Sequence, residues 1–245
     1  MLRSGNPALT DKTFGERAWG GEAMTLTGTV NKTGISLLIL MCSAALVWNG
    51  AIPQAILMPA FIGAFILSAI VALVTVFKKT AAPATTPLYA ALEGIVLGTI
   101  SLYYEQRFQG IVINAVALTF GTLAALLVAY RSGVVRATEN FKLGVFAATG
   151  AIGLLYIVSM VMSLFGTRIP YIHESGLIGI GFSVFVVVIA ALNLVLDFDF
   201  IERGAEQRAP KYMEWYGAFG LLVTLVWLYL EILRLLAKLQ GRDRR

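Results

Sequence analysis

The sequence contains little charge and few of the residues that build metal sites and disulfides. Only 13% of its residues are charged, and it has one cysteine and one histidine, whereas about a quarter of the residues in a soluble domain are charged. Because Cys42 has no second cysteine to pair with, no intrachain disulfide can form. Because His173 is the only histidine, zinc sites built on several imidazoles and the His-Glu-x-x-His motif of metalloproteases are excluded.

The sequence also lacks the motifs of nucleotide-driven transport and of common cofactors. It has no glycine-rich loop that ends in Lys followed by Ser or Thr, which argues against ATP-driven transport by this chain alone. The glycines Gly176, Gly179 and Gly181 follow no predicted strand and do not match a dinucleotide-binding fingerprint. Lys238 is too close to the end of the last apolar run to form a retinal Schiff base. Since no nucleophile and base stand at a recognisable spacing, we predict that the chain is not an enzyme and needs no obligatory cofactor.

Apolar residues in long runs dominate the sequence. Hydrophobic residues make up 58% of the chain, and the mean hydropathy is +0.79. A hydrocarbon layer of about 30 Å requires about 20 helical residues, so the runs predict an all-α integral membrane protein with seven transmembrane helices. We expect a polar tail over residues 1–33, a membrane domain over 34–239 and a basic tail over 240–245. The predicted spans are Gly34–Trp48, Ile56–Phe77, Pro87–Tyr104, Ile111–Tyr130, Phe141–Phe165, Gly176–Phe198 and Tyr212–Leu239.

The basic residues predict how the chain is oriented in the membrane. The formal net charge is +5, but the Lys and Arg residues stand in short loops and at the chain end, which is typical of membrane topology and not of nucleic-acid binding. The positive-inside rule places the N-terminal tail and the loops richest in basic residues in the cytoplasm. An odd number of spans then places the C-terminus outside, although the basic tail after the last span would itself favour the cytoplasm.

Acids near or within the apolar spans are functional candidates, because a charged group there costs several kcal/mol unless it is paired or hydrated. Glu93, in the third span, can act as a protonated hydrogen-bond donor to a neighbouring helix or as part of an ion pathway. Asp197 and Asp199 end the sixth span and point to different helix faces because they are two residues apart. Asp199 can pair with Arg203 four residues on, which leaves Asp197 to face inward. The neighbouring Gly94 and Gly98 in the third span predict close helix packing.

Glu231 lies deep in the last apolar run and has two candidate partners. Arg234, three residues on, can neutralise it within the same helix. Asp197, from another helix, can instead share a proton with it, because two carboxylates in a medium of low dielectric constant do not both ionise cheaply. Calcium, which prefers oxygen ligands, could replace that proton. We expect the two carboxyl groups to lie within hydrogen-bonding reach or to be joined by one water.

These acids stand in short motifs that keep one order along nearly the whole chain. Asp197 is followed four residues later by Ile201 and then by the charged Glu202 and Arg203. The other motifs are Leu228-Tyr229-Leu230-Glu231-Ile232-Leu233, Asn6-Pro7-Ala8-Leu9-Thr10 and Ala91-Leu92-Glu93-Gly94-Ile95-Val96-Leu97-Gly98. Together with seven spans, they resemble the Bax inhibitor-1 family of transmembrane proteins, particularly its bacterial branch with a longer N-terminal tail.

The resemblance implies two three-helix layers around a central seventh helix, in a bacterial plasma (inner) membrane. It implies a calcium leak gated by a carboxylate pair that shares a proton, and roles in cell survival, calcium homeostasis or protease regulation. The sequence departs from the family in having Glu231 where the motif has Asp, and a longer connection between the two acids. The family's basic residue at the cytoplasmic end of the second helix has counterparts in Lys78 or Lys79, which lack the bidentate fork of arginine.

The leading hypothesis from the sequence is a passive pH-sensitive calcium (cation) leak, with Asp197 and Glu231 as latch, proton sensor and calcium ligands. Supporting or ion-pathway roles fall to Asp199, Glu93, Lys78, Lys79 and Arg234. One alternative is a non-conducting regulator that binds a membrane protease or a stress-response complex. Another is a proton-coupled transporter of a small solute that uses Glu93, although no clear internal repeat supports it. The expected partners are the lipid bilayer, calcium ions and protons, and not nucleic acid.

Overall fold

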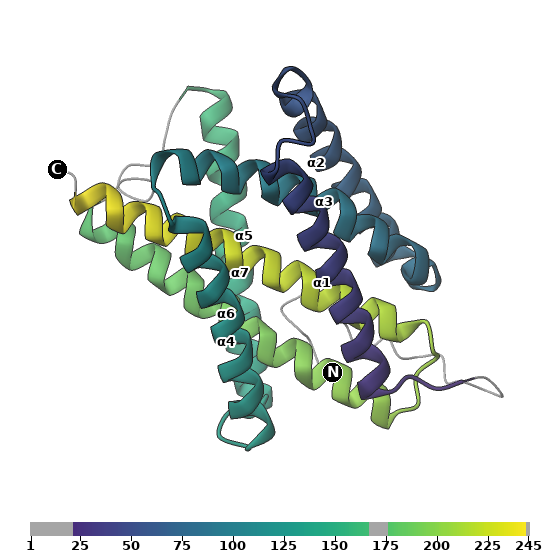
Figure 1. Cartoon of the computed structure of the whole chain (residues 1–245). Helices are drawn as coiled ribbons and strands as arrows, with labels where there is room; N and C mark the ends of the chain where they lie inside the picture. Colours follow the sequence, from purple (N-terminus) through teal and green to yellow (C-terminus); the bar gives the residue numbers. More distant parts are fainter. Residues whose placement is uncertain (1–21, 167–175, 244–245) are drawn as a thin grey trace. The chain divides into compact units, whose positions relative to one another are not determined.

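The computed structural model describes residues 22–166 and 176–243. Most of the predicted polar tail and the single histidine, His173, lie outside the described residues. The helices are α1 (Leu26–Trp48), α2 (Gln54–Phe77), the short 3-10 helix η2 (Lys79–Ala81), α3 (Ala82–Arg107), α4 (Ile111–Arg131), α5 (Glu139–Leu164), α6 (Leu177–Glu206) and α7 (Met213–Asp243) (Figure 1). Seven helices in the described part of the chain are long and apolar enough to cross a membrane, which confirms the predicted all-α membrane fold.

Two helices, α1 and α3, begin at least a full turn earlier than the hydropathy pattern predicts. α1 begins at Leu26 inside the predicted polar tail, because the Thr25 side chain accepts a hydrogen bond from the backbone N–H of Gly28 at 3.0 Å and caps the helix. α3 begins at Ala82, so Pro87 lies inside this helix and not at its start. Glu93 therefore lies about 16 Å along α3 at 1.5 Å per residue, near the middle of the helix.

The chain divides into two compact units, which are described separately. The α1–α3 unit comprises α1, α2 and α3 with residues 199–223, which are the end of α6 and the beginning of α7. The α4–α5 unit comprises α4 and α5 with the rest of α6 and α7. The seventh span has the largest buried share, 67% of its most apolar window. The central position of this helix and the two-layer arrangement stay predictions.

Glycines bring α3 close to α1 within the α1–α3 unit. A Cβ atom at Gly94 would lie 2.4 Å from the carbonyl oxygen of Leu40, and one at Gly98 would lie 2.9 Å from that of Ala44. Such distances leave no space for a larger side chain, so the two backbones can approach only where α3 carries glycine. The close packing predicted from Gly94 and Gly98 is confirmed.

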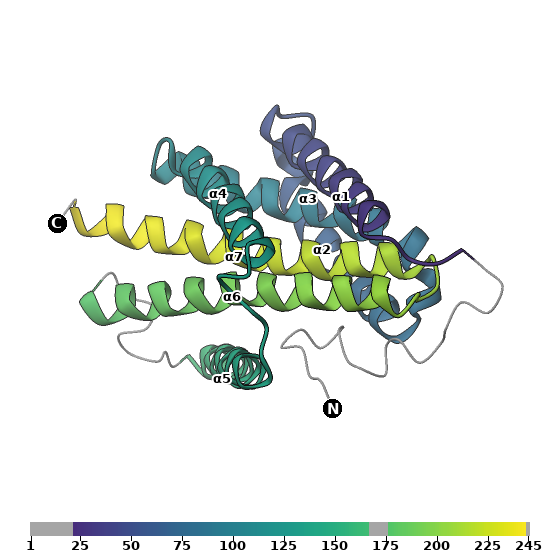
Figure 2. The ribbon, with the colours of Figure 1, turned by 90° about the horizontal axis from the view of Figure 1, so that it is seen from below.

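In the α4–α5 unit, α6 and α7 lie side by side and run in opposite directions (Figure 2). A core cluster joins Ile152 of α5 to Val186 and Ile189 of α6, and the half-buried Trp227 of α7 packs against it. Large apolar side chains such as Leu154 of α5 are more than half exposed. A surface of this kind suits lipid contact and not water.

We expect Gly94→Ala to lower the free energy of unfolding by about 1–3 kcal/mol, because the new methyl group would overlap the α1 backbone. Thermal unfolding in detergent measures the effect. Gly63→Ala is the matched control, since nothing lies within 4 Å of a Cβ atom there and alanine favours the helix by about 1 kcal/mol. Equal melting temperatures for the two variants would contradict the packing of α3 on α1.

Candidate functional site

The predicted acids occupy three different surroundings. Asp197 and Glu231 are 0% and 2% exposed and both belong to the α4–α5 unit, whereas Glu93 is 8% exposed and belongs to the α1–α3 unit. Asp199 forms an ion pair with Arg203, as their four-residue spacing predicts, with 3.1 Å between Asp199 Oδ2 and Arg203 Nε. Asp199 is therefore a neutralised group near the end of α6.

Glu231 forms a cluster with the side chains of Arg234 and Tyr156. Arg234 Nη1 donates to both carboxylate oxygens of Glu231, at 2.9 Å and 3.0 Å, and to the hydroxyl of Tyr156 at 2.8 Å. Tyr156 donates in turn to Glu231 Oε1 at 2.8 Å. The Arg234 guanidinium also lies 5.3 Å from the ring centre of Tyr156. The local pairing with Arg234, one of the two partners considered from the sequence, is therefore present.

Tyr156 is the member of this cluster that the sequence analysis missed. It lies in the middle of α5, where a lone tyrosine in an apolar helix gives little indication of a partner 75 residues away. The sequence could have indicated only that Tyr156 has a partner, because the hydroxyl of a buried tyrosine usually forms a hydrogen bond. The hydroxyl lets Tyr156 bridge the charged pair and join α5 to α7.

Lys238 of α7 contacts the first turns of α6, and these contacts show how the two antiparallel helices are aligned along their axes. Its amine donates to the carbonyl oxygen of Gly179 at 2.9 Å and to Ser183 Oγ at 2.8 Å, and the residue is 7% exposed. Sequence reasoning treated Lys238 as a basic residue at a helix end. The contacts instead place it in the interior, against the first turns of α6.

The alignment of α6 and α7 determines how far apart Asp197 and Glu231 lie along the two helices. Counted from the Lys238 contacts, Asp197 lies farther along the antiparallel helix pair than Glu231 by about 7–11 residues, or roughly 10–16 Å at 1.5 Å per residue. A direct hydrogen bond between the two carboxyl groups stays a prediction.

The remaining predicted positions lie in the α1–α3 unit, apart from these acids. Lys78 is the C-cap of α2, and Lys79 begins the short helix η2 that leads into α3. Lys78 is exposed and Lys79 is half-buried. No group of three His, Cys, Asp or Glu residues in the described part of the chain could hold a metal ion. Calcium coordination by Asp197 and Glu231 stays a prediction.

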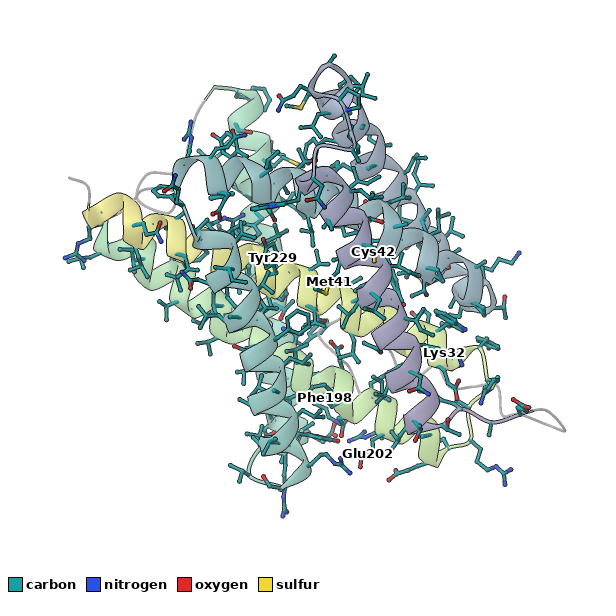
Figure 3. The ribbon with its side chains drawn as sticks, in the orientation of Figure 1. Lys32, Met41, Cys42, Phe198, Glu202 and Tyr229 are labelled. Carbon is teal, nitrogen blue, oxygen red and sulfur yellow. The ribbon has the colours of Figure 1, made fainter. Side chains whose placement is uncertain are left out.

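Glu214 forms a second charged cluster that sequence reasoning missed. It lies in the first turn of α7 and is fully buried. Oε1 accepts hydrogen bonds from the backbone N–H and the hydroxyl of Thr25, at 2.9 Å and 2.8 Å, and pairs with Lys211 at 3.1 Å. Lys32 of α1, labelled in Figure 3, pairs with Oε2. The carboxylate is thus compensated by two lysines and two neutral donors.

Gly28 makes room for this carboxylate. A Cβ atom at position 28 would lie 2.1 Å from Glu214 Oε1, so any other residue would push into the charged group. The hydrogen bond to Glu214 also raises the pKa of the half-buried Lys211 amine above its ordinary value, which keeps this lysine charged. The partners of Glu214 on α1 lie more than 180 residues away in the sequence, which explains why no local spacing indicated them.

Seven apolar helices with buried, compensated charges define an integral membrane protein. A family model described as Bax inhibitor 1 like matches residues 6–241. The chain therefore belongs to the Bax inhibitor 1 like family, which confirms the resemblance of its motifs. A search of the curated proteins finds no match to the chain.

We expect Glu214→Gln to destabilise the protein by on the order of 2–3 kcal/mol, because it leaves Lys32 without a counter-charge while glutamine keeps a hydrogen bond from Thr25. Unfolding in detergent at neutral pH measures the loss. Glu22→Gln is the control, since the Glu22 side chain is 82% exposed and pairs only loosely with Lys211, at 3.7 Å. The assignment fails if the two variants unfold at the same temperature.

Proposed function

We propose that this chain is a passive, pH-sensitive calcium leak in which buried acids on α6 and α7 control the passage of cations. The observation that carries the proposal is the burial of Asp197 and Glu231 in one unit, at 0% and 2% exposure. Ionisable groups inside a membrane protein are costly, and they commonly mark ion or proton pathways. Membership of the Bax inhibitor 1 like family supports the same proposal.

Arg234 is the barrier to calcium in this proposal. Both oxygens of Glu231 accept hydrogen bonds from Arg234, and one also accepts a hydrogen bond from Tyr156. Calcium binds through several oxygen ligands, so it would have to displace the guanidinium to use Glu231. We therefore assign the described conformation to a closed state, in which the Arg234 guanidinium is bound to the Glu231 carboxylate in place of calcium.

Opening begins when Arg234 withdraws from Glu231. The Arg234 side chain is 38% exposed, which gives it space to move, whereas Glu231 stays inside. Protons oppose the passage of calcium, because a protonated carboxyl carries no charge to attract a cation. Asp197 supplies a second carboxylate farther along the helix pair. The two acids then attract a cation at successive positions, and the leak increases as pH rises.

Reconstituted flux tests this function. We expect liposomes that contain the purified full chain to pass calcium faster at neutral than at acidic pH. Asp197→Asn should reduce the flux and flatten its pH dependence. Glu231→Gln alone would leave Arg234 uncompensated and endanger folding, so the informative variant is Glu231→Gln combined with Arg234→Gln. This double variant removes both charges together and should also flatten the pH dependence.

Glu139→Gln is the control for the flux experiment, because the Glu139 side chain is 63% exposed and pairs with Lys142 at 3.5 Å. It should leave both flux and pH dependence unchanged. Flux at the level of empty liposomes for every folded variant would overturn the leak and favour a non-conducting regulator. Flux that none of the acid variants alters would overturn the role of Asp197 and Glu231.

Calcium should also raise the melting temperature of the protein in detergent at neutral pH. A ligand that binds the folded state stabilises it by mass action, and ionised carboxylates are the groups that would bind calcium. At acidic pH protons occupy the carboxyls, so the shift should disappear. The shift should be smaller in Asp197→Asn than in Glu139→Gln. Equal calcium shifts at both pH values would count against an acidic site.

A further inference from the structure

A buried asparagine lies one helical turn before Asp197 on α6. Asn193 is 3% exposed, and both residues belong to the α4–α5 unit. Side chains four residues apart lie on the same face of a helix, so Asn193 and Asp197 are neighbours on α6. The proposed leak uses Asp197 but not Asn193. Because a buried amide usually has partners for its polar atoms, the contacts of Asn193 indicate what else this face of α6 binds.

The amide nitrogen of Asn193 is bonded to two helices. Nδ2 donates to the carbonyl oxygen of Ile189, one turn earlier on α6, at 2.8 Å, and to Thr149 Oγ1 on α5 at 2.8 Å. A carbonyl oxygen only accepts hydrogen bonds, so the amide atom that faces Ile189 is the nitrogen and not the oxygen. The contact with Ile189 therefore fixes which way the amide is turned, and Thr149 holds it from the neighbouring helix.

The amide oxygen of Asn193 is left for another partner. Nδ2 donates both side-chain hydrogen bonds that Asn193 makes within residues 22–166 and 176–243, so Oδ1 accepts none from these residues. A buried amide oxygen without a protein donor is a site for a water or an ion. Calcium coordinates asparagine carbonyl oxygens together with carboxylates. With Asp197 on the next turn, this face of α6 carries both of these ligand types.

The amide lies apart from the hydrogen-bonded cluster that contains Tyr156. On α5, Ile152 stands three residues after Thr149 and four residues before Tyr156. Ile152 belongs to one core cluster with Val186 and Ile189 of α6. Apolar side chains therefore separate the two polar groups along α5. A cation beside the amide would occupy a position of its own, as passage between successive acids requires.

We propose that Asn193 Oδ1 and the Asp197 carboxylate form a calcium-binding site in the α4–α5 unit, with Thr149 as the positioning residue that orients the amide. Water supplies the remaining ligands, because calcium takes about six to eight oxygens. The inference rests on the proposed leak for the identity of its cation, and it adds a neutral ligand to the acid. One carboxylate and one neutral oxygen bind calcium weakly enough to release it again, which passage requires.

Calcium titration of the purified full chain in detergent at neutral pH tests the site, with the melting temperature as the readout. Asn193→Ala removes a ligand and should raise the apparent Kd for calcium by about tenfold or more. Thr149→Val is the matched variant, because it removes the same hydrogen bond between α5 and α6 but keeps the amide oxygen. It should raise the Kd by less, and Thr149→Ser, which keeps a hydroxyl, should bind calcium as the unaltered protein does.

The comparison separates a calcium ligand from a residue that only joins two helices. Equal losses of affinity in Asn193→Ala and Thr149→Val would show that the amide only ties α5 to α6, and would overturn the site. A melting temperature that calcium does not change in the unaltered protein would also overturn it and would leave water as the partner of Oδ1. Asn140→Ala, at an exposed asparagine in the first turn of α5, is the control and should not change the Kd.

Asn193→Ser keeps the proposal testable if Asn193→Ala fails to fold. A serine hydroxyl can donate to the carbonyl oxygen one turn earlier, as Ser36 does to Lys32 on α1 at 2.8 Å. Asn193→Ser can therefore keep a hydrogen bond to Ile189 while it lacks the amide oxygen. We expect weaker calcium binding than in the unaltered protein, and an unchanged Kd would overturn the role of Asn193.

Calcium flux into liposomes distinguishes failure of this site from failure of the leak. We expect Asn193→Ala to pass calcium more slowly than Asn140→Ala. If the chain binds calcium through Asn193 but passes none, the site stands and the leak fails. If Asn193→Ala passes calcium as fast as the unaltered protein and with the same pH dependence, the leak stands and the site fails.

Discussion

A charged side chain inside an apolar helix bundle needs local compensation, and α7 is organised by this constraint. Glu214 receives two lysines, Glu231 receives Arg234 and a tyrosine hydroxyl, and Lys238 donates to a carbonyl oxygen and a serine hydroxyl. The partners come from α1, α5 and α6 as well as from the neighbourhood of α7 itself. Each charge therefore ties α7 to another segment, because removing either partner would leave a buried group unsatisfied.

The same constraint explains the beginning of the first helix. The Thr25 hydroxyl makes two hydrogen bonds. It accepts one from the backbone N–H of Gly28, which caps α1, and it donates one to Glu214 Oε1. The chain before the helix is also bonded, since the Met24 N–H donates to the carbonyl oxygen of Ala209 at 2.7 Å. Helix capping and charge compensation thus depend on one residue. Two polar residues of the predicted tail, Thr25 and Lys32, thus contact a buried carboxylate.

Sequence reasoning succeeded where one strong physical requirement acts along the chain. Lipid requires long apolar helices, so hydropathy predicted the seven spans, and helical geometry predicted the pairing of Asp199 with Arg203. It failed for Tyr156 and for the partners of Glu214, because these contacts join residues that are distant in sequence. A single sequence contains no local periodicity that reports such pairs. The beginning of α1 was missed because its first turn is polar, so the hydropathy pattern did not extend back to the Thr25 cap.

Short sequence motifs do not predict how two neighbouring helices are aligned along their axes. The motifs around Asp197 and Glu231 each predict a helix that carries an acid, but the distance between the acids depends on how α6 and α7 align across their connection. The contacts of Lys238 set that alignment in the described conformation. Motif resemblance therefore identifies which acids are buried, whereas tertiary hydrogen bonds decide which groups neutralise them.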